Sequence, residues 1–434
     1  MSEIIPFKAL RYDPHQVKLE DVLTQPYDKI TPEMQAKYYG KSAHNLVRII
    51  LGKAGETDTE AFNVYSRASE YLHDWRSGGI LKQDAEPGVY AYAQTFTVPG
   101  TADLAERRGL IALGRLHDYS DGVVFRHELT HSGPRADRLN LLRATQAHFG
   151  QIFMLYSDPQ RAIEALLRAR TEEDPEASVL DEYETLHRIW RIHDPALIRA
   201  VQQSMKEKKL LIADGHHRYE TALAYRNERR AQSGRNDANA AYEFVMMTLV
   251  PMESSGLVIL PTHRVVHGLP TFDRERMLEG AGRFFHIDRI DLRTESRSAT
   301  TLLGKAGENG TAFVAVTRQG PYLLRAKKNA VDDALGQVSS LQRDLDVVQL
   351  HRIMLERVLG ISEEAIRNQQ NVRYERDAFE AISWVRQGAN VAFLMNPARI
   401  EQVRDIAFAG EVLPQKSTDF YPKLLSGLAI YALE

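Results

Sequence analysis

Apolar positions along the chain follow two spacings, one typical of strands and the other typical of helices. Short apolar runs predict strands at 46–51, 89–93, 109–114, 152–156, 210–213, 244–250 and 257–260. Apolar residues three or four positions apart predict helices at 59–75, 137–148, 159–170 and 219–232. This alternation predicts a mixed α/β fold that also contains α+β parts.

The pattern changes after about residue 265. The expected elements there are a helix at 274–284, a strand at 287–290, a helix near Leu302 and paired strands at 311–317 and 321–326. From about Asp344, helices and strands alternate again. We therefore predict three parts: a catalytic domain over 1–265, a small α+β module over 266–335, and a C-terminal α/β module over 336–434 that completes the pocket.

Composition narrows the class of protein. The chain has 434 residues, of which 43% are hydrophobic and 26% are charged, as in a globular protein with a sizeable core. No apolar run is long enough for a membrane helix, and the start, MSEIIPFKAL, does not resemble a signal peptide. Cysteine is absent, which excludes disulfides, thiolate metal sites and cysteine nucleophiles and favours the cytoplasm. A net charge of -3 offers no basic surface for nucleic acid, so we expect a small-molecule substrate and leave the oligomeric state open.

The stretch His127-Glu128-Leu129-Thr130-His131 spells H-E-x-x-H, a zinc-protease signature when it lies on a helix. Strand-like residues precede it and the turn-forming Ser132-Gly133-Pro134 follows it, so we expect neither a helix nor zinc. Two readings remain, a polar connection and a catalytic loop. In the second, Glu128 is the candidate general base, and His127 and Thr130 are candidate substrate-binding residues.

A second polar cluster, Asp214-Gly215-His216-His217-Arg218, lies between a predicted strand and a predicted helix. The N-terminus of a helix presents unpaired N–H groups, glycine permits a tight turn, and arginine offers a fork for phosphate oxygens. The cluster therefore predicts an anion site in which Asp214 orients a histidine or binds a divalent cation. The alternative is an N-cap at Asp214 beside solvated histidines.

Other candidate residues are scattered along the chain. Asp28, in Pro26-Tyr27-Asp28, is the second candidate for a general base, or an ordinary turn residue. Arg138 is a candidate for binding a substrate carboxylate. Near the C-terminus, Lys416, Ser417 and Lys423 carry anion-binding groups, but without the glycines of a P-loop. This segment either binds substrate or packs at the end of the chain.

The stretch DGHHRYETA resembles the phosphate-binding G-x-x-R turn of the ParB/sulfiredoxin superfamily, and within it the free serine kinase type. This resemblance implies a ParB/sulfiredoxin-like nucleotide-binding core and phosphoryl transfer to the hydroxyl of L-serine or a similar small hydroxy-acid. Gly215, His216, His217 and Arg218 would then bind the donor phosphates, with Asp214 near Mg²⁺; Asp214 and His217 are also catalytic candidates. The donor is ADP, ATP or pyrophosphate.

A second resemblance covers nearly the whole chain, to the domain of unknown function 1015 family, and it assigns no reaction. The segments that carry it are PFKALRYDP, TQPYDKIT, HNLVRIILG, RHELTHSGPRADR, LIADGHHRYETAL, LPTHRVV and PQKSTDFYPKLLSG. Three hypotheses follow: a small-molecule kinase, a nucleotide-binding or nucleotide-hydrolysing regulator of the ParB-like type, and a zinc hydrolase built on the H-E-x-x-H stretch.

Overall fold

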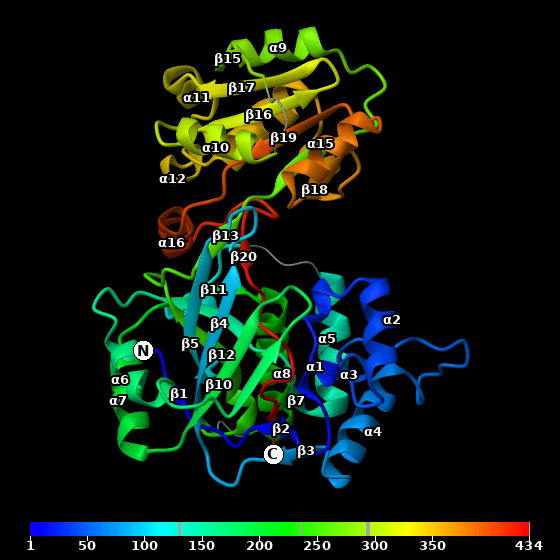
Figure 1. Ribbon diagram of the computed structural model, residues 1–434, viewed down its shortest axis with the longest axis vertical. Coiled ribbons are helices and arrows are strands. Elements are labelled where there is room, and N and C mark those ends of the chain that lie inside the picture. Colours follow the sequence, from blue (N-terminus) through cyan, green and yellow to red (C-terminus); the bar gives the residue numbers. More distant parts are fainter. Residues whose placement is uncertain (129–131, 235–236, 292–295, 434) are drawn as a thin grey trace. The chain divides into compact units, whose positions relative to one another are not determined.

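The computed structural model describes residues 1–128, 132–234, 237–291 and 296–433. The chain forms two compact units (Figure 1). Unit 1 comprises Met1–Arg126, Thr130–Val258 and Pro422–Glu434, and unit 2 comprises His127–Leu129 and Ile259–Tyr421. The end of the chain thus returns to the unit in which the chain begins. The mixed α/β class is confirmed, and the division into three parts stays a prediction.

Among the described residues, nine strands form the sheet of unit 1. Strand β11 is parallel to β6 and β12 is parallel to β8, whereas the other pairs are antiparallel. In sheet order the strands are β6 (Val124–Phe125), β11 (Leu210–Asp214), β8 (Ile152–Tyr156), β12 (Phe244–Pro251), β5 (Leu104–Arg115), β4 (Val89–Thr97), β10 (Leu186–Ile192) and β9 (Ala177–Leu180), with β1 (Ile4–Ile5) pairing with β5.

Helices flank this sheet, with α6 and α7 grouped on one side and α2 to α5 on the other (Figure 1). The helices of unit 1 are α1 (Leu19–Val22), α2 (Pro32–Lys41), α3 (Val47–Ile50), α4 (Val64–Ser77), α5 (Ser132–Thr145), α6 (Ala162–Thr171), α7 (Pro195–Met205) and α8 (His216–Ser233). Short 3₁₀ turns lie at Tyr27–Lys29, Tyr119–Asp121 and Ala241–Glu243. Two small pairs, β2 (Leu10–Tyr12) with β3 (Leu81–Gln83) and β7 (Ala147–His148) with β21 (Tyr431–Ala432), complete the unit.

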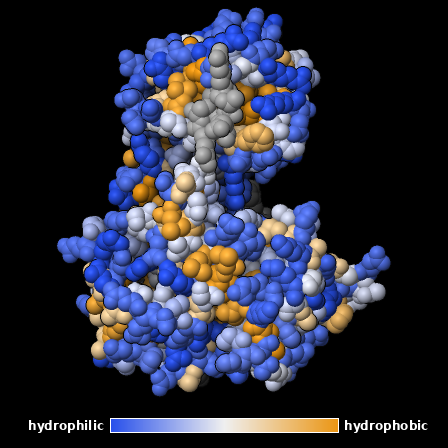
Figure 2. Space-filling model, in the orientation of Figure 1, coloured by the Kyte–Doolittle hydropathy of each residue, from blue (hydrophilic) through white to orange (hydrophobic). Residues whose placement is uncertain are grey.

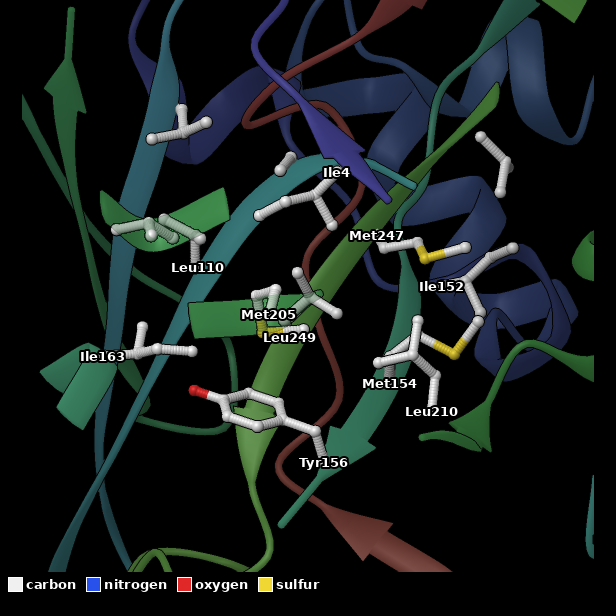
Figure 3. Packing of buried hydrophobic residues seen from close by; sticks show 14 of the residues in the cluster. Ile4, Leu110, Ile152, Met154, Tyr156, Ile163, Met205, Leu210, Met247 and Leu249 are labelled. Atoms are coloured by element: carbon white, nitrogen blue, oxygen red, sulfur yellow. The ribbon is translucent and has the colours of Figure 1, made fainter. Parts of the chain in front are cut away.

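The core of unit 1 explains its apolar runs. Residues from adjacent strands and from α6 and α7 point into one cluster (Figure 3). Strands that are covered on both faces have no solvent-facing positions, so their sequences read as continuous apolar runs. All eight residues of β12 are buried. Burying one such side chain contributes about 1.5–3 kcal/mol, so this cluster anchors the strands on which the site is built.

Two local expectations are wrong. The run 46–51 is not a strand, since α3 occupies Val47–Ile50. The Asn45 side chain accepts a hydrogen bond from the Val47 N–H at 3.0 Å, which favours a turn of the backbone at this point over an extended strand. The expected turn at 132–134 is instead the start of α5, because proline is tolerated in the first turn of a helix.

Unit 2 contains an antiparallel sheet. In sheet order its strands are β15 (Phe285–Arg289), β17 (Gly320–Ala326), β16 (Ala312–Thr317), β19 (Val391–Met395), β14 (His263–Val266) and β18 (Val372–Glu375). Its helices are α9 (Arg274–Gly282), α10 (Ser296–Gly307), α11 (Lys328–Ala334), α12 (Ser340–Arg343), α13 (Asp346–Gln349), the π-helix Leu350–Val358, α14 (Glu363–Arg367), α15 (Ala378–Arg386) and α16 (Ile400–Phe408). The short strands β13 (Val258–Leu260) and β20 (Asp419–Tyr421) pair with each other.

Polar side chains cover most of the face shown in Figure 2, with apolar residues in small groups. Within the described parts of the chain, no helix is both long enough and apolar enough to cross a bilayer.

A buried carboxyl group makes the stability of unit 2 depend on pH. Burial raises the pKa of Asp346 to about 6, against hydrogen bonds from Thr311 and Asn396 that lower it. The folded state therefore binds this proton more tightly than the unfolded state. The contribution of the protonated Asp346 carboxyl to the free energy of unfolding is fully present below the pKa that this group has in the unfolded chain, and it is lost as pH rises through about 6. We expect Asp346→Asn to raise the free energy of unfolding by about 1–2 kcal/mol at pH 8, with the gain vanishing near pH 4.

Denaturant unfolding at both pH values measures this effect. The exposed neighbour Asp344, whose side chain lies near Lys328, provides the matched control, and we expect Asp344→Asn to leave stability nearly unchanged. An Asp346→Asn protein that is less stable than the wild type at pH 8 would contradict the assignment.

Candidate functional site

The turn between β11 and α8 is built by a buried strand that ends at a polar cluster. Residues 210–213 are buried and apolar, and α8 begins directly after Gly215, three residues earlier than the spacing of apolar residues predicted. Gly215 has φ +97, and a Cβ at this position would lie 3.1 Å from the Arg218 guanidinium. Glycine is therefore required both for the backbone conformation and for the space that Arg218 occupies.

Asp214 binds two cationic side chains, one with each carboxylate oxygen. Arg218 Nη2 donates to Oδ2 at 2.6 Å, and Lys423 Nζ donates to Oδ1 at 3.1 Å. Burial opposes the ionisation of Asp214, but the charges of Lys423, Arg218 and Lys29 outweigh burial and hold the pKa of Asp214 below its ordinary value. The carboxylate therefore stays ionised at neutral pH.

Cationic side chains surround the Asp214 carboxylate. Lys423, Arg218 and Lys29 act on it, in a site where only 9% of the Lys423 side chain and 15% of the Arg218 side chain are exposed. Arg218 Nη1 also donates to the Gln151 carbonyl, so the guanidinium plane is held at two ends. A fixed guanidinium in a cationic, partly buried site is suited to binding phosphate oxygens.

A pocket of about 70 Å³ in unit 1 adjoins this turn. On its polar side, Arg138 stacks over the Tyr27 ring at 4.2 Å and donates to the Ile50 carbonyl at 2.6 Å. Burial and the charges of Asp28 and Asp137 raise the pKa of Tyr27, and the charges of Arg218 and Arg138 lower it, so carboxylates as well as both guanidinium groups act on this hydroxyl. The lining residues are Pro26, Tyr27, Ile50, Arg138, Leu141, Leu142, Ala147, His148, Phe149, Gly150, Arg218, Thr221, Val245 and Ser426.

The pocket thus combines an apolar wall with two guanidinium groups, of which Arg218 is paired with Asp214 and Arg138 with Asp137. Such a shape accepts a small molecule that carries a negative charge at one end. A Cβ added at Gly150 would lie 3.2 Å from Ser426 Oγ and 3.4 Å from Arg218 Nη1, so glycine leaves room where the C-terminal segment and α8 meet the pocket.

The structure brings several of the predicted residues together within unit 1. Arg138 lines the pocket with Arg218, and Lys423 binds Asp214. Asp28 lies between Tyr27 and Lys29 on one 3₁₀ turn, and its side chain is exposed. In the first turn of α8, His216 is buried and His217 is half-buried.

Three residues of the site were missed, namely Tyr27, Lys29 and Ser426. Tyr27 and Lys29 flank the candidate Asp28, so the segment PYDK carried a usable local signal. Ser426 carried none, because only folding brings it to Gly150. The roles predicted for all these residues stay predictions.

The predicted residues His127, Glu128, Lys416 and Ser417 belong to unit 2. His127 is buried, and its Nε2 lies 2.8 Å from Thr418 Oγ1. Glu128 Oε1 accepts a hydrogen bond from the Lys416 N–H at 3.1 Å, and Ser417 donates to the Pro414 carbonyl. His127 and Glu128 are not helical, as expected, while Thr130 and His131 lie outside the described residues.

The side chains do not fit a resident metal ion. No group of three or more histidine and acidic side chains that could hold one occurs in the described ranges. Both oxygens of Asp214 are bound to cations, which a metal ion would have to displace. Asp214 as a Mg²⁺ ligand stays a prediction, and no step below depends on a metal.

Comparison with solved structures gives distant likenesses. A free serine kinase variant in complex with ADP has a TM-score of 0.34 and 12% identity, covering 70% of this chain and 89% of that chain. A conserved hypothetical protein from Pyrococcus furiosus has a TM-score of 0.32 and 12% identity, covering 70% and 92%. SbnI with a C-terminal truncation, from Staphylococcus aureus, has a TM-score of 0.36 and 10% identity, covering 73% and 87%. Likenesses at this level carry no argument about activity.

Comparison at the sequence level is decisive for the family. No curated protein matches the chain. Residues 4–348 match the family described as Protein of unknown function (DUF1015), and this match includes the Asp214–Arg218 turn, Asp28 and Arg138. Because the match covers well over half of the sequence, this chain belongs to the DUF1015 family.

Proposed function

We propose that the protein is a small-molecule kinase that transfers a phosphoryl group from a nucleotide or pyrophosphate to the hydroxyl of free L-serine or a similar small hydroxy-acid. The observation that carries this proposal is the cationic turn at Asp214, where Arg218, Lys423 and Lys29 surround one carboxylate beside a pocket. The resemblance of the DGHHR turn to the phosphate turn of free serine kinases supports the choice of serine.

The donor phosphates bind at the start of α8. Arg218 and Lys423 neutralise phosphate oxygens, and the N–H groups of the first turn, from His216 onward, add hydrogen bonds along the positive end of the helix dipole. Arg138 binds the carboxylate of the acceptor on the other side of the pocket. The two guanidinium groups then hold the two anionic ends of the reacting pair, and this positioning is the main requirement of phosphoryl transfer.

In the transfer step, the acceptor hydroxyl oxygen attacks the terminal phosphorus of the donor. A new P–O bond forms, the bond to the leaving phosphate oxygen breaks, and the leaving group keeps the electron pair. The hydroxyl proton passes to a carboxylate base. We favour Asp28, because its 3₁₀ turn also carries Tyr27, which lines the pocket, and Lys29, which acts on Asp214. Glu128, in unit 2, is the second candidate.

The test is direct. Purified protein is incubated with L-serine and Mg²⁺ and with ADP, ATP or pyrophosphate in turn, and phosphoserine is measured by mass spectrometry. Formation of phosphoserine with any donor supports the proposal. Absence of product with every donor, both forward and from phosphoserine backward, rejects the serine version. Tight nucleotide binding with slow hydrolysis that no acceptor accelerates favours the regulatory alternative.

Substitution of the two candidate bases separates their roles. We expect Asp28→Asn to lower kcat by about 100-fold or more, because it removes the proton acceptor, and to leave pyrophosphate affinity within about twofold. Glu128→Gln, the matched change in unit 2, is expected to keep most of the activity. The opposite result assigns the base to Glu128, and full activity in both variants removes both residues from the mechanism.

A further inference from the structure

The C-terminal strap, defined as residues 422–427, supplies two groups to the site from the far end of the chain. Lys423 binds Asp214, and Ser426 lines the pocket next to Gly150. The family match ends at residue 348, so these contacts come from a segment that the match does not cover. The strap is neither helix nor strand, and its position depends on what binds its backbone.

Buried side chains of the sheet bind the strap at its first two residues. Gln94 of β4 and Arg107 of β5 are register partners, and Arg107 Nε donates to Gln94 Oε1 at 3.1 Å. Arg107 Nη2 donates to the Pro422 carbonyl, and Gln94 Nε2 donates to the Lys423 carbonyl at 2.8 Å. Both side chains are 1% exposed.

Burying an arginine is costly. Burial lowers the pKa of Arg107 to about 10, while the charge of Asp214 acts in the opposite direction. The guanidinium stacks over Phe153 at 4.5 Å, so the sheet holds it by packing as well as by hydrogen bonds. Arg107 is a buried cation that binds both Gln94 of β4 and the Pro422 carbonyl of the strap. It therefore needs both acceptors to be held in fixed positions.

A second set of buried, hydrogen-bonded side chains contacts the strap at Leu425, two residues after Lys423. Tyr92 lies two residues before Gln94 on the same face of β4, and it accepts a hydrogen bond from the Leu425 N–H. Its hydroxyl lies 2.6 Å from His187 Nδ1, and His187 Nε2 lies 3.1 Å from Asp181 Oδ2. Burial lowers the pKa of His187 against the charge of Asp181, so the ring is neutral, Tyr92 donates to Nδ1, and Nε2–H donates to Asp181.

Backbone bonds secure the end of the strap. The Ser426 N–H donates to the Thr24 carbonyl at 2.8 Å, and the Gly427 N–H donates to the Phe149 carbonyl at 3.1 Å. Five of the six strap residues are therefore bound to the body of unit 1. These contacts restrain the backbone on both sides of Lys423, the strap residue whose charge enters the site.

We infer that the strap is a functional part of the anion site, and that Arg107, with Gln94 and Tyr92, is a positioning residue that holds Lys423 against Asp214. This inference rests on the proposed phosphate-binding function. Arg107 does not touch the ligand; it acts through the Pro422 carbonyl and sets where the Lys423 ammonium lies. The site is therefore incomplete in any chain that lacks residues 422–427.

Calorimetry with inorganic pyrophosphate on the full-length protein measures the consequence. We expect Lys423→Met to weaken binding about tenfold, and Arg107→Met to weaken it by a similar factor. The double variant should bind no more weakly than either single variant, since both remove the same interaction. Arg107→Lys should recover part of the affinity. Arg108→Met, the adjacent arginine, which pairs with Glu106, is the matched control and should bind as the wild type does.

Hydrogen exchange of the strap amides gives a second readout that needs no ligand. Arg107→Met should speed exchange at Leu425 and Ser426, whereas Lys423→Met should not. If Arg107→Met does not fold, Tyr92→Phe is used in its place. This change removes one hydroxyl and is expected to weaken pyrophosphate binding about threefold.

Wild-type affinity in the folded Arg107→Met protein, or additive losses in the double variant, would overturn the inference. Unchanged strap exchange would do so as well. Failure of the wild type to bind pyrophosphate would instead reject the proposed anion site, while the exchange data would still report whether Arg107 holds the strap.

Discussion

Replacing Arg218 with methionine is expected to weaken the binding of ADP or pyrophosphate by about 100-fold or more. The guanidinium is held by Asp214 and by the Gln151 carbonyl, so its remaining donors are oriented before the ligand arrives. Two charge-assisted hydrogen bonds to phosphate oxygens contribute about 3 kcal/mol or more together, which corresponds to this loss. Methionine keeps an unbranched apolar side chain at this position but donates nothing.

Isothermal titration at fixed ionic strength measures the change, because electrostatic binding weakens with salt. Arg143 of α5 provides the control, since its exposed guanidinium pairs with Glu228 away from the pocket, and Arg143→Met should change affinity less than twofold. Thermal unfolding of both variants shows whether they remain folded. Wild-type affinity in a folded Arg218→Met protein would remove the turn from the binding site.

Replacing Gly256 with alanine is expected to lower the stability of unit 1 by about 3 kcal/mol. Gly256 follows β12 and packs against the backbone of β5, where an added Cβ would overlap the Glu106 carbonyl and crowd the Arg107 N–H. Backbone atoms in the middle of a sheet cannot move aside without breaking ladder hydrogen bonds, so the strain of overpacking is not relieved. The displaced strand is the one that carries Arg107.

Gly40→Ala is the matched control. Gly40 lies in α2 with open space around the position of a Cβ, so alanine should stabilise that helix by about 0.5–1 kcal/mol. Urea unfolding followed by tryptophan fluorescence measures both changes. The protein has three tryptophans, and in a Trp384→Phe background the remaining two, Trp75 and Trp190, report on unit 1 alone. Equal stability of Gly256→Ala and the wild type would contradict the packing argument.

Local patterns predicted five strands of the main sheet of unit 1 (β4, β5, β8, β11 and β12), because continuous apolar runs such as 152–156 and 210–213 match strands buried on both faces. The same patterns did not predict β1, β9 and β10. They failed at 46–51, where the same kind of run is a short helix. Strand preference mainly reflects packing against neighbours, and in this segment a hydrogen bond from the Val47 N–H to the Asn45 side chain favours a turn of the backbone. The start of α5 at Ser132 was missed for a similar reason, since Ser-Gly-Pro is compatible both with a turn and with a first helical turn.

Local patterns likewise predicted some residues of the candidate site and not others. The DGHHR turn was predictable, because an apolar strand, a glycine with positive φ and a helix start are all local features of the sequence. The residues that surround this turn in the folded protein could not be predicted from the sequence. Lys423 was a candidate for its anion-binding chemistry, but nothing in the sequence paired it with Asp214 across more than 200 residues.

By itself, the sequence determined the mixed α/β class, the family and the position of the polar turn at Asp214–Arg218, because each of these is recorded in local patterns of residues. Only the tertiary structure decided which charges surround that turn and how the C-terminal strap reaches it. The reason is physical: Lys423 meets Asp214 in a segment whose carbonyls accept buried hydrogen bonds from Gln94 of β4 and Arg107 of β5. Those bonds exist only after the sheet has formed, so no local pattern records them.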